Sequence, residues 1–334
     1  MSVSSKSPRK ILCVALATAQ KSLPLYAHRF SPKKFTQHQL FACLVLKTFF
    51  KVDYRGIVAI LRDAPEICSA MGLLHVPHFT TLHKASRRLL RAPRVERLLD
   101  RTVRLAMGRR RQVALGAVDS TGMESRHISS YYVKRRSRDP GKWQTTTYTR
   151  FPKLGLVCDC RTHVVLSLLA TRGPTPDINQ FRRTLHPATR RVRIRHVVAD
   201  AGYDSESNHR YAREACGIRT TIPPKHGRPT TKLPKGRYRR LMKQRFDTES
   251  YGQRWQSETV FSMIKRNLGS ALRSRTYWAQ CRELGLIVLT HNIMIILSRI
   301  GFLQSMSGRF FGTVKILPDT FSCFSCVCWH LFLL

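Results

Sequence analysis

The sequence predicts an α/β protein in which a helical N-terminal region precedes a core built around a sheet. Three observations support this class. Residues 1 to about 105 carry apolar side chains at helical spacing. From residue 113 onwards the chain shows short, nearly continuous apolar runs, which are typical of strands buried inside a sheet. Helix-like stretches alternate with these runs, as they do where helices cover a sheet.

The N-terminal region, residues 1–108, contains several stretches with a helical pattern. The clearest predicted helices span residues 36–50, 53–61 and 82–90. The first begins at Thr36, a residue type that caps helix N-termini well. The third is rich in lysine and arginine, and helices with basic faces can dock on duplex DNA. The alternative is a helical cap on the main domain, with its arginines in solvent.

Two of the buried runs end in an aspartate. Residues 113–118 are followed by Asp119, and residues 195–199 are followed by Asp200. In open α/β sheets, functional sites form at the ends of central strands. We therefore expect both carboxylates at one edge of the sheet. The alternative for each is a simple turn or cap residue.

The stretch from Tyr251 to Lys265 is predicted to form one helix with two faces. At about 100° per residue, Tyr251, Arg254, Glu258 and Lys265 fall within a sector of roughly 60°. A neighbouring apolar stripe that begins at Val260 would dock the helix on the core. The alternative is a solvated helix whose arginine and glutamate form an ordinary surface pair four residues apart.

The charge balance points to a polyanionic partner. The chain has 59 Lys+Arg against 19 Asp+Glu, a formal net charge of +40. Such an excess destabilises a compact state by self-repulsion unless a polyanion shares the surface. The surplus is spread along the chain, so we expect double-stranded DNA as the partner.

The most basic stretch is a predicted mobile loop at residues 223–250, which has no acid between Glu214 and Asp247. We expect this loop to become ordered on phosphates, and the alternative is a linker without function. Its predicted DNA contacts are Lys235, Arg237, Arg239 and Arg240.

Three gathered carboxylates in so basic a chain suggest metal-dependent phosphodiester chemistry. Asp119, Asp200 and Glu258 offer hard oxygen ligands, which suit Mg²⁺ or Mn²⁺ better than zinc. Two such ions can activate an attacking oxygen and stabilise a leaving one. Nearby cations would hold phosphates, and Tyr251 and Trp255 offer aromatic faces for an unpaired base.

At these residues the chain resembles bacterial insertion-sequence transposases with a DDE catalytic triad. The match consists of Asp119, Asp200 and Glu258 together with the spaced signature Y-(2)-R-(3)-E-(6)-K, formed here by Tyr251, Arg254, Glu258 and Lys265. The segment Ala199 to Asp204 is similar to the family's second-aspartate motif. The resemblance covers about residues 35 to 300, and the chain after about residue 300 departs from the family.

The resemblance implies a ribonuclease-H-like core in residues 109–300 and cut-and-paste movement of DNA with terminal inverted repeats. It further implies that the three acids bind two Mg²⁺ or Mn²⁺ ions. By the same resemblance, Tyr251, Arg254 and Lys265 would contact DNA near the cleaved end, and we expect Trp255 to contact DNA through its aromatic face. The expected partners are the inverted repeats, the target DNA and a second copy of the chain in the synaptic complex.

The last segment, residues 301–334, is an apolar tail with three cysteines. Its final fourteen residues, 321–334, are too few to span a bilayer, so no membrane partner is expected. Ten cysteines without an extracellular framework, and no convincing signal peptide, favour the cytoplasm and an association with the nucleoid. Two other functions stay open: an inactive DNA-binding relic, and a metal-dependent nuclease without strand transfer.

Overall fold

The computed structural model describes residues 6–108, 111–125, 151–225 and 232–306. Residues 1–298 form one compact unit and residues 299–334 a second. The predicted domain boundary at residue 108 stays a prediction, and most of the predicted tail lies outside the described residues.

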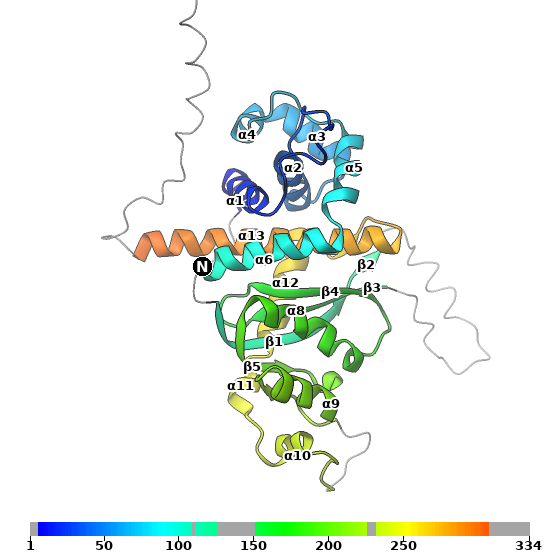
Figure 1. Cartoon of the computed structure of the whole chain (residues 1–334), viewed down its shortest axis with the longest axis vertical. Helices are drawn as coiled ribbons and strands as arrows, with labels where there is room; N and C mark the ends of the chain where they lie inside the picture. The colour runs from blue at the N-terminus through cyan, green and yellow to red at the C-terminus, as the bar shows by residue number, and fades with distance from the viewer. Residues whose placement is uncertain (1–5, 109–110, 126–150, 226–231, 307–334) are drawn as a thin grey trace, which may run out of the picture. The chain divides into compact units, whose positions relative to one another are not determined.

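The N-terminal region is helical, as its apolar spacing predicts (Figure 1). Thr36 caps the second helix in a reciprocal arrangement: its hydroxyl accepts from the backbone N–H of Gln39, whose side chain accepts from the N–H of Thr36. Asp53 caps the third helix by accepting from the N–H of Gly56 at 2.6 Å. The helices of this region are α1 (Pro8–Gln20), α2 (Gln37–Phe49), α3 (Tyr54–Asp63), α4 (Pro65–Ala70), α5 (Phe79–Leu89) and α6 (Ala92–Met107).

The core is a five-stranded mixed sheet with the order β4-β3-β1-β5-β6. β1 pairs antiparallel with β3, which pairs antiparallel with β4, whereas β5 and β6 run parallel to β1. The predicted α/β class is therefore confirmed. The strands are β1 (Gln112–Gly122), β3 (Pro152–Asp159), β4 (Val165–Arg172), β5 (Arg193–Ala199) and β6 (Arg219–Thr221), with a separate parallel pair of β2 (Glu124–Ser125) and β7 (Ala271–Leu272).

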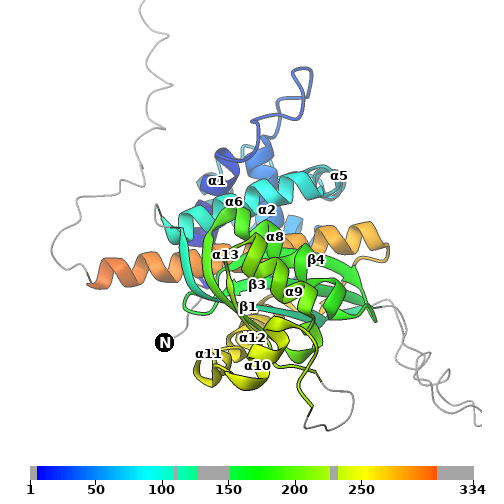
Figure 2. The same cartoon turned by 60° about the horizontal axis from the view of Figure 1, so that its bottom comes forward.

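Helices cover both faces of this sheet. In β3, Leu156 packs into one cluster with α12 (Trp255–Leu268) and α13 (Tyr277–Met306). Its neighbour Val157 packs into a second cluster with α8 (Phe181–Arg191) on the opposite face (Figure 2). This alternation is the two-residue period of a strand buried on both sides.

Short elements connect the later strands. They are η1 (Asp177–Asn179), η2 (Ala201–Tyr203), α9 (Glu206–Arg210) and η3 (Tyr211–Ala215), followed by α10 (Arg237–Gln244) and α11 (Thr248–Gly252). α10 falls inside the stretch 223–250 that was predicted as a loop, and α11 begins inside it, so the loop prediction is wrong for these helical residues. The reason is a carboxylate outside the stretch: Glu206 accepts from the backbone N–H groups of Tyr238 and Arg239, which start α10.

Helix α13 is a core helix. Its segment Tyr277–Leu297 is long and apolar enough to cross a membrane by length and composition, but 78% of its most apolar window is buried within the protein. Its fully buried Asn292 accepts from the N–H of Val165 at 2.9 Å and donates to the carbonyl of Val165 at 2.8 Å. The same amide donates to Thr102 on α6. Asn292 therefore supplies Val165, the first residue of the outer strand β4, with the two hydrogen bonds that a neighbouring strand would supply there.

The opposite edge of the sheet has a similar feature. Arg213 on η3 donates from Nε to the hydroxyl of Thr220 and from Nη2 to its carbonyl, both at 2.7 Å. Thr220 is the middle residue of the three-residue strand β6. Each outer strand thus has one backbone carbonyl that accepts a hydrogen bond from a side chain: Val165 on β4 and Thr220 on β6.

Candidate active site at the ends of two parallel strands

The register of β1 and β5 brings the two predicted aspartates together. Val118 lies opposite Ala199 in this parallel pair, so Asp119 and Asp200 are the next residues on neighbouring strands. Asp119 is half-buried, and Asp200 is exposed as it leads into η2. The two carboxylates are close enough for the charge of Asp200 to raise the pKa of Asp119.

Asp119 is held by two hydrogen bonds. Its Oδ1 accepts from the backbone N–H of Ser120 at 2.7 Å, and its Oδ2 accepts from the hydroxyl of Ser257 at 2.8 Å. Burial is the largest influence on its pKa and raises it; the two serine bonds and the charge of Arg254 only partly offset this. Ser257, fully buried at the start of α12, therefore fixes the orientation of the first aspartate.

Glu258, the third predicted acid, lies one helical turn after Arg254, whose guanidinium is close to two carboxylates. The guanidinium of Arg254 donates from Nη2 to Glu258 Oε1 at 2.7 Å, and its Nη1 lies 3.7 Å from Asp119 Oδ2. The Arg254 side chain is 25% exposed and that of Glu258 is 59% exposed. Partial burial lowers the pKa of Arg254, but the hydrogen bond to Glu258 and the charges of Glu258 and Asp119 outweigh burial and raise it. The pair is thus more than a surface contact along one helix.

The predicted continuous helix from Tyr251 to Lys265 is interrupted. α11 ends at Gly252 and α12 begins at Trp255. Between them the backbone N–H groups of residues 253, 254, 256 and 257 bond to carbonyls three residues earlier, which tightens the turn. Tyr251 consequently belongs to the shorter helix, where its ring lies 5.1 Å from that of Phe246.

The other signature residues lie around the same strand end. Lys265 donates to the hydroxyl of Thr121 at 2.8 Å, two residues after Asp119 on β1. Trp255 is 53% exposed at the start of α12, next in sequence to Arg254. Lys265 is therefore fixed near the end of β1, and much of the Trp255 side chain is open to solvent.

Asp177 is a fourth carboxylate that the sequence patterns did not single out as a site residue. Its Oδ1 accepts from the hydroxyl of Ser120 at 2.7 Å and lies 2.8 Å from the ammonium of Lys153. Asp177 and Asp200 also lie on either side of Gly202, since a Cβ added there would meet both side chains within 3.8 Å. Asp177 thus ties the turn after β1 to the turn after β5. A carboxylate after two prolines, in 173–177, was the only sequence signal for it.

The basic stretch divides into exposed and internal residues. Lys235, Arg237 and Arg240 are exposed on or beside α10. Arg239 instead binds the buried carboxylate of Asp204, with Nη2 at 2.7 Å and Nε at 2.9 Å from Oδ2. The geometry therefore argues against Arg239 as a phosphate contact. The other three side chains are open to solvent, where a phosphate could reach them.

The donor set suits a hard cation. Two neighbouring carboxylates repel each other, and the burial of Asp119 intensifies the need for a positive charge beside it. Arg254 supplies that charge in this structure. Across the described residues, no three Asp, Glu, His or Cys side chains are grouped closely enough to hold an ion as they stand. In this arrangement Glu258 is paired with Arg254.

Most of the core matches the model of a known protein family. A family model described as "Transposase DDE domain" matches residues 113–293, more than half of the chain. No curated protein matches. Two solved structures align with 86% of the chain at 14% identity. They are a Mos1 strand transfer complex (82% of that chain, TM-score 0.28) and a pre-cleavage Mos1 transpososome (83%, TM-score 0.19). At these TM-scores the two likenesses carry no weight for the residues of this site.

Proposed function

Since the chain belongs to the transposase DDE domain family, we propose that it moves an insertion sequence by a cut-and-paste reaction. In this reaction it would cleave phosphodiester bonds at terminal inverted repeats and join the freed ends to target DNA. The observation that carries the proposal is the β1–β5 register, which sets Asp119 beside Asp200 at the strand ends, within reach of the helix that bears Glu258.

We assign Asp119, Asp200 and Glu258 as the ligands of one or two divalent cations. Mg²⁺ or Mn²⁺ would supply an activated oxygen nucleophile and stabilise charge at a phosphodiester. Ser257 keeps Asp119 pointing toward this site by donating to its Oδ2. Arg254, once parted from Glu258, is free to grip the scissile phosphate with its planar fork.

The remaining signature residues would position the DNA. Lys265 is held against Thr121 at the end of β1, where its charge can steady a phosphate. Tyr251 and Trp255 offer aromatic faces beside Arg254 for a base that has left the stack. The exposed cations of α10 would extend the contact along the backbone. A homodimer in the synaptic complex and a place at the nucleoid complete the proposal.

The test is a cleavage assay on duplexes that carry the DNA flanking the gene, with Mg²⁺ or with a chelator. Asp119→Asn, Asp200→Asn and Glu258→Gln should each lower the cleavage rate by a factor of about 10² or more, because each removes a charge that a metal needs. DNA affinity should stay close to that of the unaltered protein, since affinity comes mainly from phosphate contacts. Glu249→Gln, an exposed acid on α11, is the matched control and should leave both unchanged.

The outcomes separate the alternatives. Cleavage without joined products would identify a nuclease, and DNA binding without metal-dependent cleavage would identify an inactive relic. Near-normal cleavage by any one of the three acid variants would remove that residue from the site.

A further inference from the structure

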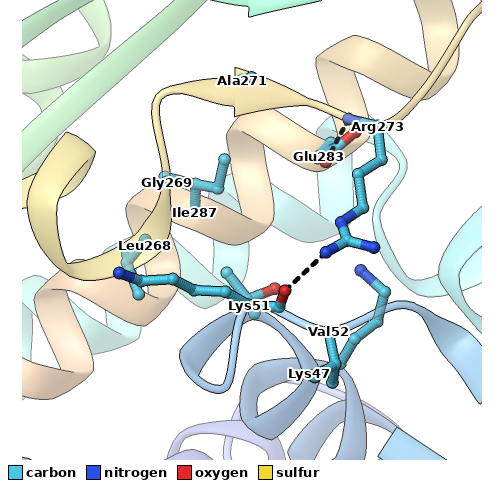
Figure 3. Close-up of a pocket in the computed structure, with 10 residues that line it drawn as sticks. Lys47, Lys51, Val52, Leu268, Gly269, Ala271, Arg273, Glu283 and Ile287 are labelled. Atoms are coloured by element: carbon cyan, nitrogen blue, oxygen red, sulfur yellow. Dashed lines mark hydrogen bonds between the residues drawn. The ribbon is translucent and has the colours of Figure 1, made fainter. Parts of the chain in front are cut away.

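A pocket outside the carboxylate site lies where the end of α2, the end of α12 and the start of α13 meet (Figure 3). It has an open volume of about 420 Å³, including solvent at its mouth. Three of its lining residues are cations, Lys47, Lys51 and Arg273, and one is an acid, Glu283. No step of the proposed reaction uses these residues.

Lys47 is the unusual member of this set. It is only 9% exposed, and its ammonium lies 4.8 Å from the centre of the Tyr54 ring. Among the residues that the structure describes, no carboxylate lies within ion-pair distance of this ammonium. Burial lowers the pKa of Lys47, and the charge of Glu283 opposes this only in part. A buried ammonium without a close counter-charge costs stability, so the charge needs another explanation.

Arg273 brings a second cation to the same place. Its Nη2 donates to the carbonyl of Lys51 at 2.7 Å, which fixes the guanidinium at the pocket mouth. Figure 3 shows the ammonium of Lys47 and this guanidinium approaching each other. Their repulsion also lowers the pKa of Lys47. Two like charges held together in this way form a ready receptor for an anion.

In the described part of the chain, the nearby acids form hydrogen bonds with backbone N–H groups and no ion pair with Lys47. Glu283 accepts from the backbone N–H groups of Arg273 and Ser274 at 3.0 and 2.9 Å. Asp53, whose charge also reaches Lys47, accepts from the N–H of Gly56. The Lys51 ammonium donates to the carbonyl of Arg266. The pocket therefore keeps two convergent positive groups, from Lys47 and Arg273.

We propose that Lys47 and Arg273 form a binding site for one phosphate group of a DNA backbone. An ammonium as a point charge and a guanidinium as a planar fork are the two side-chain groups that bind phosphate best. DNA is the source that fits the net charge of +40. This inference rests on the proposed function, because it assumes that DNA is the substrate.

The position of the pocket supports the same substrate. Helix α12 carries Glu258 in its first turn and reaches the pocket with Leu268 and Gly269. Ten residues of helix span roughly 15 Å, or about four base-pair steps of duplex. One duplex cut at Glu258 is thus long enough to place a phosphate of its flank at Lys47.

The test measures the salt dependence of duplex binding by the full chain. Lys47→Met should reduce the slope of log K against log salt by about 0.9 and leave the melting temperature unchanged or raised, because methionine fills the same space without a buried charge. Arg273→Gln, at an exposed residue, should reduce the slope by a similar amount. Lys51→Met is the control: Lys51 lines the same pocket, but its ammonium points away from Lys47 and Arg273 and donates to the carbonyl of Arg266 (Figure 3), so the slope should not change.

Three results would overturn the inference. The first is an unchanged slope in both Lys47→Met and Arg273→Gln. The second is an equal reduction of the slope in Lys51→Met, which would mean that any cation near this surface contributes equally to DNA binding. The third is stabilisation by inorganic phosphate that Lys47→Met abolishes without any effect on the duplex slope, which would identify a free-phosphate site. Since these experiments measure binding, a failure here leaves the cleavage tests of the three acids untouched.

Discussion

Arg254 is the residue at which a catalytic role and a merely structural role predict different measurements. Arg254→Ala should slow single-turnover cleavage in saturating Mg²⁺ by a factor of about 10². The loss of stability should be under about 1 kcal/mol, because Glu258 is 59% exposed and exposed pairs contribute little. The measurements are a melting curve and a cleavage time course.

Two further variants show which property of Arg254 the cleavage reaction requires. Arg254→Lys keeps the charge but loses the planar fork that would grip a phosphate at two points, so it should restore little activity. Arg266→Ala removes an exposed arginine from the same helix and should leave cleavage unchanged. Full activity in Arg254→Lys would reduce the requirement to charge alone.

For single residues, the sequence predicted the positions of the site's acids better than the residues that form hydrogen bonds around them. Asp119 and Asp200 were predictable because each follows a short buried run, and the register then made them neighbours. Ser257 carries no signal of its own: a serine in a helix is ordinary until the helix is docked and its hydroxyl meets Asp119. Asp177 follows a proline-rich turn, where no periodicity fixes the direction of a side chain.

Helix α10 shows why a run of like charges is not necessarily a disordered element. Glu206 stabilises the start of this helix by accepting from its backbone N–H groups. The buried Asp204 forms an ion pair with Arg239 of the same helix. Both acids lie shortly after Asp200 in the sequence. Burial raises the pKa of Asp204, but the bonds from His209, Arg239 and Lys225 outweigh this and lower it overall. The partners lie more than thirty residues away from α10 in sequence, so composition alone could not reveal them.

The basic residues of this element should therefore separate into two groups. Replacing Lys235, Arg237 or Arg240 by Ala should reduce the salt slope of duplex binding by up to about 0.9 each, with little change in stability. Arg239→Ala should instead cost about 3 kcal/mol, because it strips a buried carboxylate of its main partner. Chemical denaturation and binding titrations over a range of salt measure both. The reverse pattern would place Arg239 at the DNA and the others in solvent.

The interrupted signature helix also could not be predicted from residue types alone. Tyr251, Arg254, Glu258 and Lys265 share one face of an ideal helix, and the spacing pattern holds in the structure only from Arg254 onwards. Hydrogen bonds to carbonyls three residues back change the angle per residue between residues 250 and 257. A pattern of residue types cannot distinguish these two bonding schemes.

For the whole molecule, acid should weaken the fold before carboxylates begin to protonate. Burial lowers the pKa of His291 in α13 and of His196 in β5 from 6.5 to about 4. The unfolded chain therefore binds more protons than the folded chain between these values, so stability is present above pH 6.5 and falls as pH decreases toward 4. Each histidine should account for up to about 3 kcal/mol.

Urea denaturation at several pH values checks this. His291→Gln keeps a donor for the carbonyl of His163 and should flatten the decline between pH 6.5 and 4. His75→Asn, at an exposed residue, should leave the pH profile as it is. An unchanged profile in His291→Gln would show that another group drives the loss.

The side chains on the two outer strands limit how copies of this chain can assemble. Asn292 occupies the free backbone groups of Val165 on β4, and Arg213 occupies the carbonyl of Thr220 on β6. Each of these side chains competes with an added strand for the backbone groups at that point of the edge, so it disfavours the joining of two sheets into one ribbon. We therefore expect a synaptic pair to meet through helices or through the DNA they share. The same contacts should also disfavour strand addition in a fibril when DNA screens the repulsion between chains.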